Sequence, residues 1–224
     1  MKCVIPCAGR STRMGLGIPK PLLKVGDRTL LECVMEPWVG LVDSFVVVAS
    51  KENQAEIRAL GWTQVEVVVQ AEPKGLADAI FQSSGLVKGK FVVTLGDCLY
   101  RGKWEDKNLE FGIGVLRYFG DKEFQKSYAV SINTVRGNVA RVTEKPYSQM
   151  GGWCGMGTYF MDERVFSYIR AASKKPSGGD FTEVIQDMID AGENIKPVWF
   201  DGDYINVTYP EDLDVVRGML NGKA

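Results

Sequence analysis

Residues 2–23 read KCVIPCAGRSTRMGLGIPKPLL and join a short apolar run to a loop of glycines and cations. The run 3–5 has the apolar, β-branched character of a buried strand. Gly9, Arg10, Arg13 and Lys20 lie in the loop that follows. A glycine after a strand lets the backbone approach an oxyanion, and a nearby arginine or lysine supplies the opposite charge. The stretch predicts a phosphate-binding loop, and a solvated surface loop is the simpler possibility.

Apolar, β-branched runs alternate with helical patterns and predict an α/β fold. The expected strands are 3–5, 45–49, 65–70, 91–95, 113–118, 129–133, 139–144, 158–161 and 196–200. The expected helices are 30–39, 54–60, 76–86, 164–172, 181–191 and 210–220. We expect one domain, 1–224, with a three-layer α/β/α, Rossmann-like architecture. Its doubly wound sheet should be predominantly parallel and become mixed in the second half.

Composition restricts the kind of chemistry. The 224 residues carry a net charge of −1, which argues against sustained binding to duplex nucleic acid or an anionic membrane. The chain has no histidine, so the commonest general base and transition-metal ligand are missing. Its five cysteines are scattered and odd in number, which indicates reduced thiols. Without a signal peptide pattern or a membrane-length apolar run, we expect a cytoplasmic protein.

Three polar loops follow expected strands, at 9–20, 70–75 and 96–100. In doubly wound sheets the ligand binds outside the carboxyl ends of the strands, so these loops should converge. Asp97 follows the apolar strand 91–95, where one carboxylate can bind a Mg²⁺ that bridges phosphate oxygens. The simpler possibility is an aspartate that forms a Gly-Asp turn.

Residues 8–14 (AGRSTRM) and 19–23 (PKPLL) together resemble the signature of the nucleotidyltransferase superfamily that makes nucleotide sugars. Ser11 stands where many members have glycine. The resemblance implies that Arg13 and Lys20 act catalytically, by neutralising the triphosphate as pyrophosphate leaves. It also implies a set of residues that wrap the nucleotide: Ala8, Gly9, Arg10, Ser11 and Thr12.

The resemblance continues in order along the chain. Residues 70–80 (QAEPKGLADAI) resemble the segment of sugar-1-phosphate uridylyl- and thymidylyltransferases in which Gln70 and the Gly75 backbone would read a pyrimidine base. Residues 95–100 (LGDCLY) are similar to a segment of glucose-1-phosphate thymidylyltransferases, which implies catalytic and metal roles for Asp97 and a substrate contact for Tyr100.

The sugar and metal sites are implied by the later segments. Residues 144–146 (EKP) and 157–160 (GTYF) resemble sugar-binding segments, which implies that Glu144, Lys145 and Gly157 contact the sugar phosphate. Residues 204–213 (YINVTYPEDL) place Asn206 where the family has a second metal-binding carboxylate. Asp97 and Asn206 are therefore the expected Mg²⁺ ligands, although Asn206 could also be only a strand-end residue.

Several further positions depart from the family pattern or stay open. Asp201 or Asp203 could supply the charge that the metal site lacks. Lys174 or Lys175 stands in the region of a family arginine. Trp153 either stacks on the ligand or packs in its loop.

The resemblance implies transfer of a nucleoside monophosphate from an NTP, UTP or dTTP being favoured, to a sugar 1-phosphate, with release of pyrophosphate. The attacking phosphate monoester has a second pKa of about 6, so no general base is needed. The expected partners are these two substrates, with a possible homo-oligomer.

Three other functions remain open. The first is a CTP-dependent cytidylyltransferase that acts on a polyol or choline phosphate. The second is a glycosyltransferase that uses the D-x-D motif 201–203 to bind a metal. The third is a non-catalytic, nucleotide-binding regulatory subunit.

Overall fold

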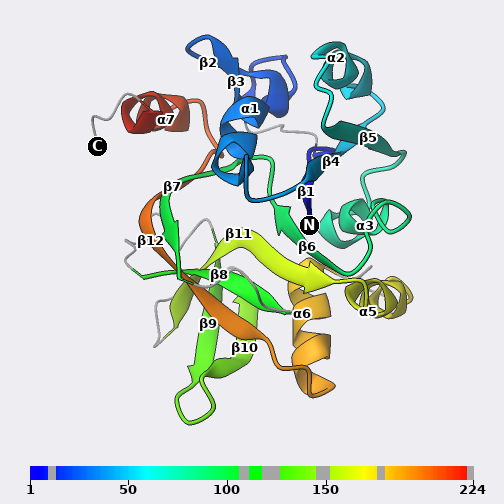
Figure 1. The fold of residues 1–224 in the computed structure, drawn as a ribbon, viewed down its shortest axis with the longest axis vertical. Coiled ribbons are helices and arrows are strands. Elements are labelled where there is room, and N and C mark those ends of the chain that lie inside the picture. Colours follow the sequence, from blue (N-terminus) through cyan, green and yellow to red (C-terminus); the bar gives the residue numbers. More distant parts are fainter. Residues whose placement is uncertain (10–13, 106–110, 118–126, 145–151, 176–179, 221–224) are drawn as a thin grey trace.

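The structure is a computed structural model that describes residues 1–9, 14–105, 111–117, 127–144, 152–175 and 180–220 (Figure 1). The strands are β1 (Lys2–Pro6), β2 (Lys24–Val25), β3 (Arg28–Thr29), β4 (Ser44–Ser50), β5 (Val65–Gln70), β6 (Lys90–Thr94), β7 (Cys98–Trp104), β8 (Gly112–Leu116), β9 (Tyr128–Asn133), β10 (Asn138–Glu144), β11 (Trp153–Asp162) and β12 (Lys196–Asn206). The α-helices are α1 (Leu30–Met35), α2 (Gln54–Ala59), α3 (Leu76–Phe81), α5 (Val165–Ala172), α6 (Phe181–Asp190) and α7 (Asp212–Leu220). Short 3-10 helices span Lys20–Leu22 and Glu36–Trp38.

The central sheet has the strand order β5-β4-β1-β6-β11-β8-β12-β7. The first four strands in this order are parallel, as the sequence predicts for the first half of the chain. β11 is antiparallel to β6 and β8, β12 is parallel to β8, and β7 is antiparallel to β12. The β9–β10 hairpin pairs with β11 and projects at the lower end of Figure 1. This mixed sheet confirms the expected fold class.

Helices cover both faces of the sheet, because side chains alternate between the two faces along each strand. Cys3 and Ile5 of β1 belong to an apolar cluster that includes residues of α1, α2 and α7. Val4, which lies between them, belongs to a second cluster with residues of α3, α5 and α6. The two clusters are the two interfaces of a three-layer α/β/α arrangement.

The structure differs from the predicted elements mainly around β7. The sequence predicts a ligand loop at the start of residues 98–104, but these residues form a strand that pairs with the unexpectedly long β12. Helix α1 ends at Met35 instead of residue 39, because Pro37 has no N–H for the next helical hydrogen bond. Helix α3 is likewise shorter than predicted and ends at Phe81. None of the helices in the described ranges is long and apolar enough to cross a membrane.

Candidate active site

The start of the first loop is tied to β4 and to the turn that follows it. Cys7 N–H donates to the Val48 carbonyl at 2.7 Å, and the Asn53 side chain donates to the Cys7 carbonyl at 2.9 Å. Asn53 is 2% exposed, so this bond is enclosed within the protein. Ala8 is buried and Gly9 exposed, and a Cβ at Gly9 would meet nothing within 4 Å. Packing within the described chain therefore does not account for this glycine, and its contact with a nucleotide stays a prediction.

Lys20 and Asp97 meet where the ends of β6 and β12 come together. The Lys20 Nζ donates to Asp97 Oδ2 and to the Val207 carbonyl, both at 2.8 Å. The Lys20 side chain is 14% exposed and that of Asp97 30%, so the ion pair is partly shielded from water. A lysine ammonium has three N–H donors, and these two bonds leave one for an additional acceptor. The sequence-predicted convergence of the two residues is present in the structure.

Three backbone contacts fix the position of Asp97. Val207 N–H donates to the Asp97 carbonyl at 2.8 Å, Gly96 N–H to the Pro6 carbonyl at 3.3 Å, and Leu95 N–H to the Gly157 carbonyl at 2.8 Å. A Cβ at Gly96 would lie 2.5 Å from the Cys7 Sγ, which real Cβ atoms do not tolerate. The turn after β6 therefore packs closely on the end of β1 and directs Asp97 to the edge where the strands end.

Asn206 lies beside this turn, since it pairs with Cys98 in the β7–β12 ladder. Its Oδ1 accepts a hydrogen bond from the Thr208 hydroxyl at 3.3 Å. Among the described residues, no group of three His, Cys, Asp or Glu side chains is arranged to hold a metal ion. One carboxylate with one amide oxygen suits Mg²⁺, which usually keeps several waters and binds protein through one or two carboxylates plus substrate phosphates. The donor set thus fits a Mg²⁺ that is shared with a nucleotide.

Two thiols form the base of the site. Cys7 and Cys98 are buried, and burial raises the pKa of both thiols far above the ordinary value, with the Asp97 carboxylate as the second cause. The Cys98 Sγ and the Tyr204 hydroxyl share a hydrogen bond at 3.2 Å, and Gly157 N–H donates to the same hydroxyl at 3.4 Å. These thiols stay protonated at neutral pH, so they serve as packing groups beneath Asp97 and not as nucleophiles.

Gln70 and Gly75 occupy the carboxyl end of β5 and the start of α3. The Gln70 Nε2 donates to the Gly75 carbonyl at 3.1 Å and to Asp78 Oδ2 at 2.7 Å. Gly75 has a φ of +92°, a backbone conformation that glycine adopts without strain. The structure therefore brings together the two residues that the sequence predicts as a base-reading pair.

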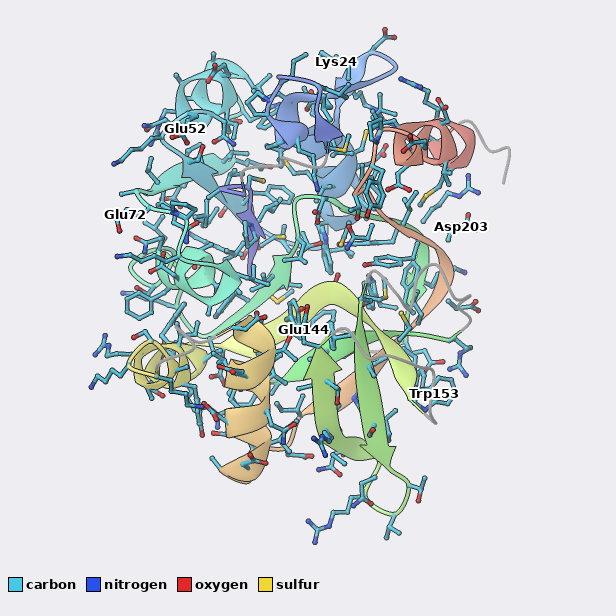
Figure 2. All side chains as sticks on the ribbon, turned by 180° about the vertical axis from the view of Figure 1, so that it is seen from behind. Lys24, Glu52, Glu72, Glu144, Trp153 and Asp203 are labelled. Atoms are coloured by element: carbon cyan, nitrogen blue, oxygen red, sulfur yellow. The ribbon has the colours of Figure 1, made fainter. Side chains whose placement is uncertain are left out.

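The sugar-side residues are positioned by the antiparallel half of the sheet. Glu144 ends β10, and its Oε2 accepts a hydrogen bond from the Thr182 hydroxyl of α6 at 2.8 Å. Figure 2 shows Glu144 near the middle of the molecule, at the end of β10 beside α6. Gly157 is buried in β11, where a Cβ would lie 2.6 Å from the Cys98 Sγ and 2.8 Å from Leu95. Close packing of neighbouring strands thus accounts for this glycine, and its contact with a sugar stays a prediction.

Tyr100 does not fit the substrate contact that the sequence predicts. It is 4% exposed, and its hydroxyl bonds to the Thr94 hydroxyl at 2.8 Å. Its ring packs edge-on against Trp38, Trp104 and Phe200. Tyr100 belongs to β7, a strand where the sequence predicts a loop. We therefore assign Tyr100 to the core and leave it out of the proposed site.

Lys175 and Trp153, whose roles the sequence leaves open, both have side-chain partners in the structure. The Lys175 Nζ bonds both oxygens of Asp187 in α6, at 2.7 and 2.6 Å, so it stabilises the packing of α5 and α6. Trp153 packs edge-on against Trp199 with ring centroids 4.7 Å apart. It is 39% exposed, and Figure 2 shows it near the outer edge of the molecule.

The D-x-D motif lies in the β7–β12 ladder. Asp203 bonds Arg101 at 2.8 Å, and Arg101 also donates to the Met219 carbonyl near the end of α7. Asp201 and Asp203 lie five and three residues before Asn206 along β12, which at the rise of a strand is about 16 and 10 Å. Neither aspartate therefore supplies the charge that the proposed metal site lacks.

Five predicted site residues lie outside the described residues: Arg10, Ser11, Thr12, Arg13 and Lys145. Two residues at the site were not predicted, namely Asn53 and Asp78. Asn53 offers little signal, because its role is a hydrogen bond to a carbonyl 46 residues away. Asp78 lies within the base-reading segment, so its position in the first turn of the helix after Gln70 could have suggested it.

Comparison with known proteins identifies the family of this chain. A family model described as nucleotidyl transferase matches residues 3–206. The bifunctional protein GlmU of Methanococcus aeolicus is 22% identical over 218 residues, which cover 95% of this chain and 53% of that protein. The bifunctional protein GlmU of Methanocaldococcus jannaschii is also 22% identical, with 100% of this chain and 57% of that protein covered. The chain thus spans about half the length of these two relatives.

A shorter relative and two solved structures match over nearly their whole length. The UTP–glucose-1-phosphate uridylyltransferase AglF of Haloferax volcanii is 23% identical, with 98% of this chain and 96% of that protein covered. The inositol-1-phosphate CTP transferase of T. maritima superposes with a TM-score of 0.84 at 19% identity, over 99% of this chain and 95% of that one. A UDP-glucose pyrophosphorylase in complex with UDP-glucose superposes with a TM-score of 0.83 at 17% identity, over 100% and 99% of the two chains. With nearly its full length matched by the family model, this chain belongs to the nucleotidyl transferase family.

Proposed function

We propose that the protein transfers a nucleoside monophosphate from an NTP, with UTP or dTTP favoured, to a sugar 1-phosphate and releases pyrophosphate. The observation that carries the proposal is the Lys20–Asp97 pair at the edge where β1, β6 and β12 end. In this family member, that edge combines a phosphate-binding cation with a carboxylate suited to Mg²⁺. Membership of the family and the named activities of its relatives support the same reaction.

The reaction forms one bond and breaks one. An oxygen of the sugar phosphate attacks the α-phosphorus of the NTP, and the bond from that phosphorus to the oxygen bridging to the β-phosphorus breaks. The leaving group takes the bond electrons as pyrophosphate. Because the attacking phosphate is ionised at neutral pH, a chain without histidine can perform this step. The protein contributes by positioning the two substrates and by stabilising the negative charge of the phosphates, as in other phosphoryl-type transfers.

Lys20 supplies a positive charge from a restrained position. Its bond to the Val207 carbonyl holds the ammonium at the strand edge, and its third donor is available to a phosphate oxygen. Asp97 and Asn206 would hold Mg²⁺ together with the phosphates, and the ion would neutralise charge on the transferred and leaving groups. Lys20 would then share its positive charge between Asp97 and a phosphate oxygen. Arg13 is proposed to add a second cation from the same loop.

The position of Gln70 supports the proposal that the nucleotide carries a pyrimidine base. Its amide lies at the end of β5, one parallel strand beyond β4, to which the first loop is tied. The remaining members of the proposed site are Ala8, Gly9, Gly75, Glu144, Lys145 and Gly157 for the two substrates. The five cysteines are buried and form no disulfide, which supports a reducing, cytoplasmic setting.

CTP-dependent transfer to a polyol phosphate is the second candidate. A bifunctional IPC transferase and DIPP synthase of Archaeoglobus fulgidus is 29% identical over 145 residues, which cover 63% of this chain and 29% of that protein. The superposition on an inositol-1-phosphate CTP transferase shows a shared fold. These likenesses favour a cytidylyltransferase over a D-x-D glycosyltransferase, and the pairing of Asp203 with Arg101 also speaks against a metal at that motif.

The test is a matrix of the four common NTPs and dTTP against hexose 1-phosphates, inositol 1-phosphate and choline phosphate, with Mg²⁺. Released pyrophosphate is measured, and the nucleotide product is identified by mass. We expect UTP or dTTP with a hexose 1-phosphate to give the highest rate. Dominance of CTP with a polyol phosphate would establish the second candidate, and no pyrophosphate from any pair would refute both.

A further inference from the structure

The Gln70 amide has a fixed orientation between β5 and α3. Its Nε2 donates to the Gly75 carbonyl at 3.1 Å and to Asp78 Oδ2 at 2.7 Å. A carbonyl and an ionised carboxylate only accept hydrogen bonds, so the nitrogen of the amide, not its oxygen, must face them. Asp78, through the shorter of the two bonds, and the Gly75 carbonyl together determine which end of the Gln70 amide points the other way.

Asp78 is itself held in place by the next turn of the chain. Gln82 Nε2 donates to Asp78 Oδ1 at 3.3 Å and to the Asp78 carbonyl at 3.4 Å. Gln82, Asp78 and Gln70 thus form a continuous series of side-chain contacts that begins beyond α3 and ends at the strand tip. A residue held from both sides restrains its neighbour more firmly than one with free rotamers.

The oxygen end of Gln70 is the part that can meet a ligand. Gln70 is 5% exposed. In the described part of the chain, Gln70 Oε1 has no hydrogen-bond partner, and it is not among the polar side-chain atoms closed off from solvent. The small exposed surface of Gln70 therefore includes Oε1. At this point the site presents a hydrogen-bond acceptor and no amide donor.

We infer that Asp78 is a positioning residue. By orienting Gln70, it makes the proposed base site prefer a base that donates a hydrogen bond from N3, which means uracil or thymine over cytosine. The inference rests on the proposed function, in which Gln70 reads the base. The N3–H of uracil or thymine donates to a fixed acceptor, whereas N3 of cytosine is itself an acceptor and faces repulsion there. Specificity of this kind depends on the repulsive contact as much as on the attractive one. Loss of Asp78 leaves only the longer bond to the Gly75 carbonyl, so the Gln70 amide can turn more readily and offer its Nε2 to cytosine.

The experiment compares UTP with CTP at one fixed hexose 1-phosphate in the full chain. kcat/KM is measured for wild type, D78A and D78N, and the readout is the ratio of the two values. We expect wild type to prefer UTP by about tenfold or more, because a buried acceptor facing an acceptor is costly. In D78A that preference should fall by about tenfold, with D78N between the two, because an asparagine can face Gln70 with either end of its amide.

A carboxylate on the same segment provides the matched control. Glu72 is exposed and pairs with Lys74 at 3.0 Å, whereas the Gln70 amide bonds Gly75 and Asp78. E72Q removes one negative charge from this segment and should leave the UTP/CTP ratio unchanged. If D78A lowers both kcat/KM values by the same factor, Asp78 only stabilises α3 and the inference is overturned. A wild-type preference for CTP also overturns it.

Binding measurements separate this inference from the transfer activity. Calorimetry with Mg²⁺·UTP and Mg²⁺·CTP gives the ratio of dissociation constants without turnover. A UTP preference in binding that D78A removes, with no pyrophosphate released, would refute the proposed transfer and uphold the role of Asp78. Equal binding of both nucleotides by wild type, or binding of neither, would overturn the role of Asp78.

Discussion

Two aspartates of this chain bond to a cation at the same distance but in different surroundings. Asp97 meets Lys20 and Asp203 meets Arg101, each at 2.8 Å. The first pair has side-chain exposures of 30% and 14%, and the second 46% and 47%. Lys20 also bonds a carbonyl at the edge where three strands end, whereas Arg101 bonds a carbonyl near the end of α7.

The difference in burial and neighbours, and not the length of the ion pair, is the reason that we propose the first pair as part of the site and treat the second as a structural link. The motif D-x-D at 201–203 is a familiar metal-binding pattern, yet Asp203 pairs with Arg101 in the middle of the β7–β12 ladder. Asp97 follows a less distinctive pattern but lies at the converging strand ends. Substitutions in the two regions should therefore affect different properties, activity in the first and stability in the second.

The largest effect is expected from removal of either member of the first pair. Asp97→Ala removes the proposed Mg²⁺ ligand and Lys20→Ala a phosphate-binding cation, and each should reduce kcat by about 10³-fold, since several kcal/mol of charge stabilisation is lost. The measurement is pyrophosphate release at saturating substrates. Circular dichroism and the thermal midpoint serve as controls that the variants fold. Rates near wild type in a folded variant would remove that residue from the proposed mechanism.

The second effect is on stability, in the β7–β12 ladder. Gly202 has a φ of +148°, and a Cβ there would lie 2.3 Å from the Arg101 carbonyl oxygen. Gly202→Ala should lower the free energy of unfolding by at least about 2 kcal/mol, because strain and a clash with backbone add together. Urea denaturation measures this free energy of unfolding.

Gly85→Ala is the matched control for this substitution, because a Cβ at Gly85 would meet nothing within 4 Å. Its stability should stay close to that of wild type. Equal stabilities for the two alanine variants would contradict the close approach of β7 and β12. A Gly202→Ala protein that folds should keep its kcat, because the substitution lies away from Asp97.

The third effect is a loss of stability at high pH. Burial raises the pKa of the Cys3, Cys7, Cys33 and Cys98 thiols above the ordinary value of 9.0. Below pH 9 the thiols are protonated in both the folded and the unfolded chain. Above it the unfolded chain loses these protons and the folded chain keeps them, so stability falls by up to about 1.4 kcal/mol per thiol and pH unit. Urea midpoints at pH 8 and pH 10 measure the change.

Thiol labelling tests directly whether the two thiols at the proposed site are buried. At pH 8, iodoacetamide should modify Cys7 and Cys98 only after denaturant is added, as mass spectrometry of peptides can show. Rapid labelling of either thiol in the folded protein would mean that the base beneath Asp97 is open to solvent.

The smallest effect is expected in the second ion pair. Asp203→Ala removes an exposed partner of Arg101 and should cost at most about 1 kcal/mol of stability, since exposed ion pairs contribute little. Its kcat should equal that of wild type. A loss of activity comparable to that of Asp97→Ala would place the metal site at the D-x-D motif and remove the contrast between the two regions.

The same contrast explains what the sequence could predict. β4, β5 and β6 were predicted to within one residue at each end, because each contains an unbroken run of three or more apolar, mostly β-branched residues. β7 was missed because residues 98–104 mix apolar and charged residues around Gly102, and glycine usually weakens a strand. Gly102 lies opposite Gly202, where a Cβ on either residue would approach the other strand's backbone within 2.3 Å.

At the proposed site, the sequence motifs predicted where residues lie in the fold better than where their side chains point. Lys20 and Asp97 meet as expected, 77 residues apart in the chain. Tyr100 lies within a recognised motif, but its side chain points into an aromatic cluster that only the tertiary structure reveals. The bond that orients Gln70 comes from Asp78, and the sequence does not show which end of an amide faces its neighbour. The roles of Arg10, Ser11, Thr12, Arg13 and Lys145 stay predictions.

A crystal structure with Mg²⁺ and a non-hydrolysable UTP analogue tests the central claim most directly. The account predicts the triphosphate beside Lys20, with the metal ion bound by Asp97 and the base at Gln70. A triphosphate and metal ion bound instead at Asp201 and Asp203, away from Lys20, would contradict it.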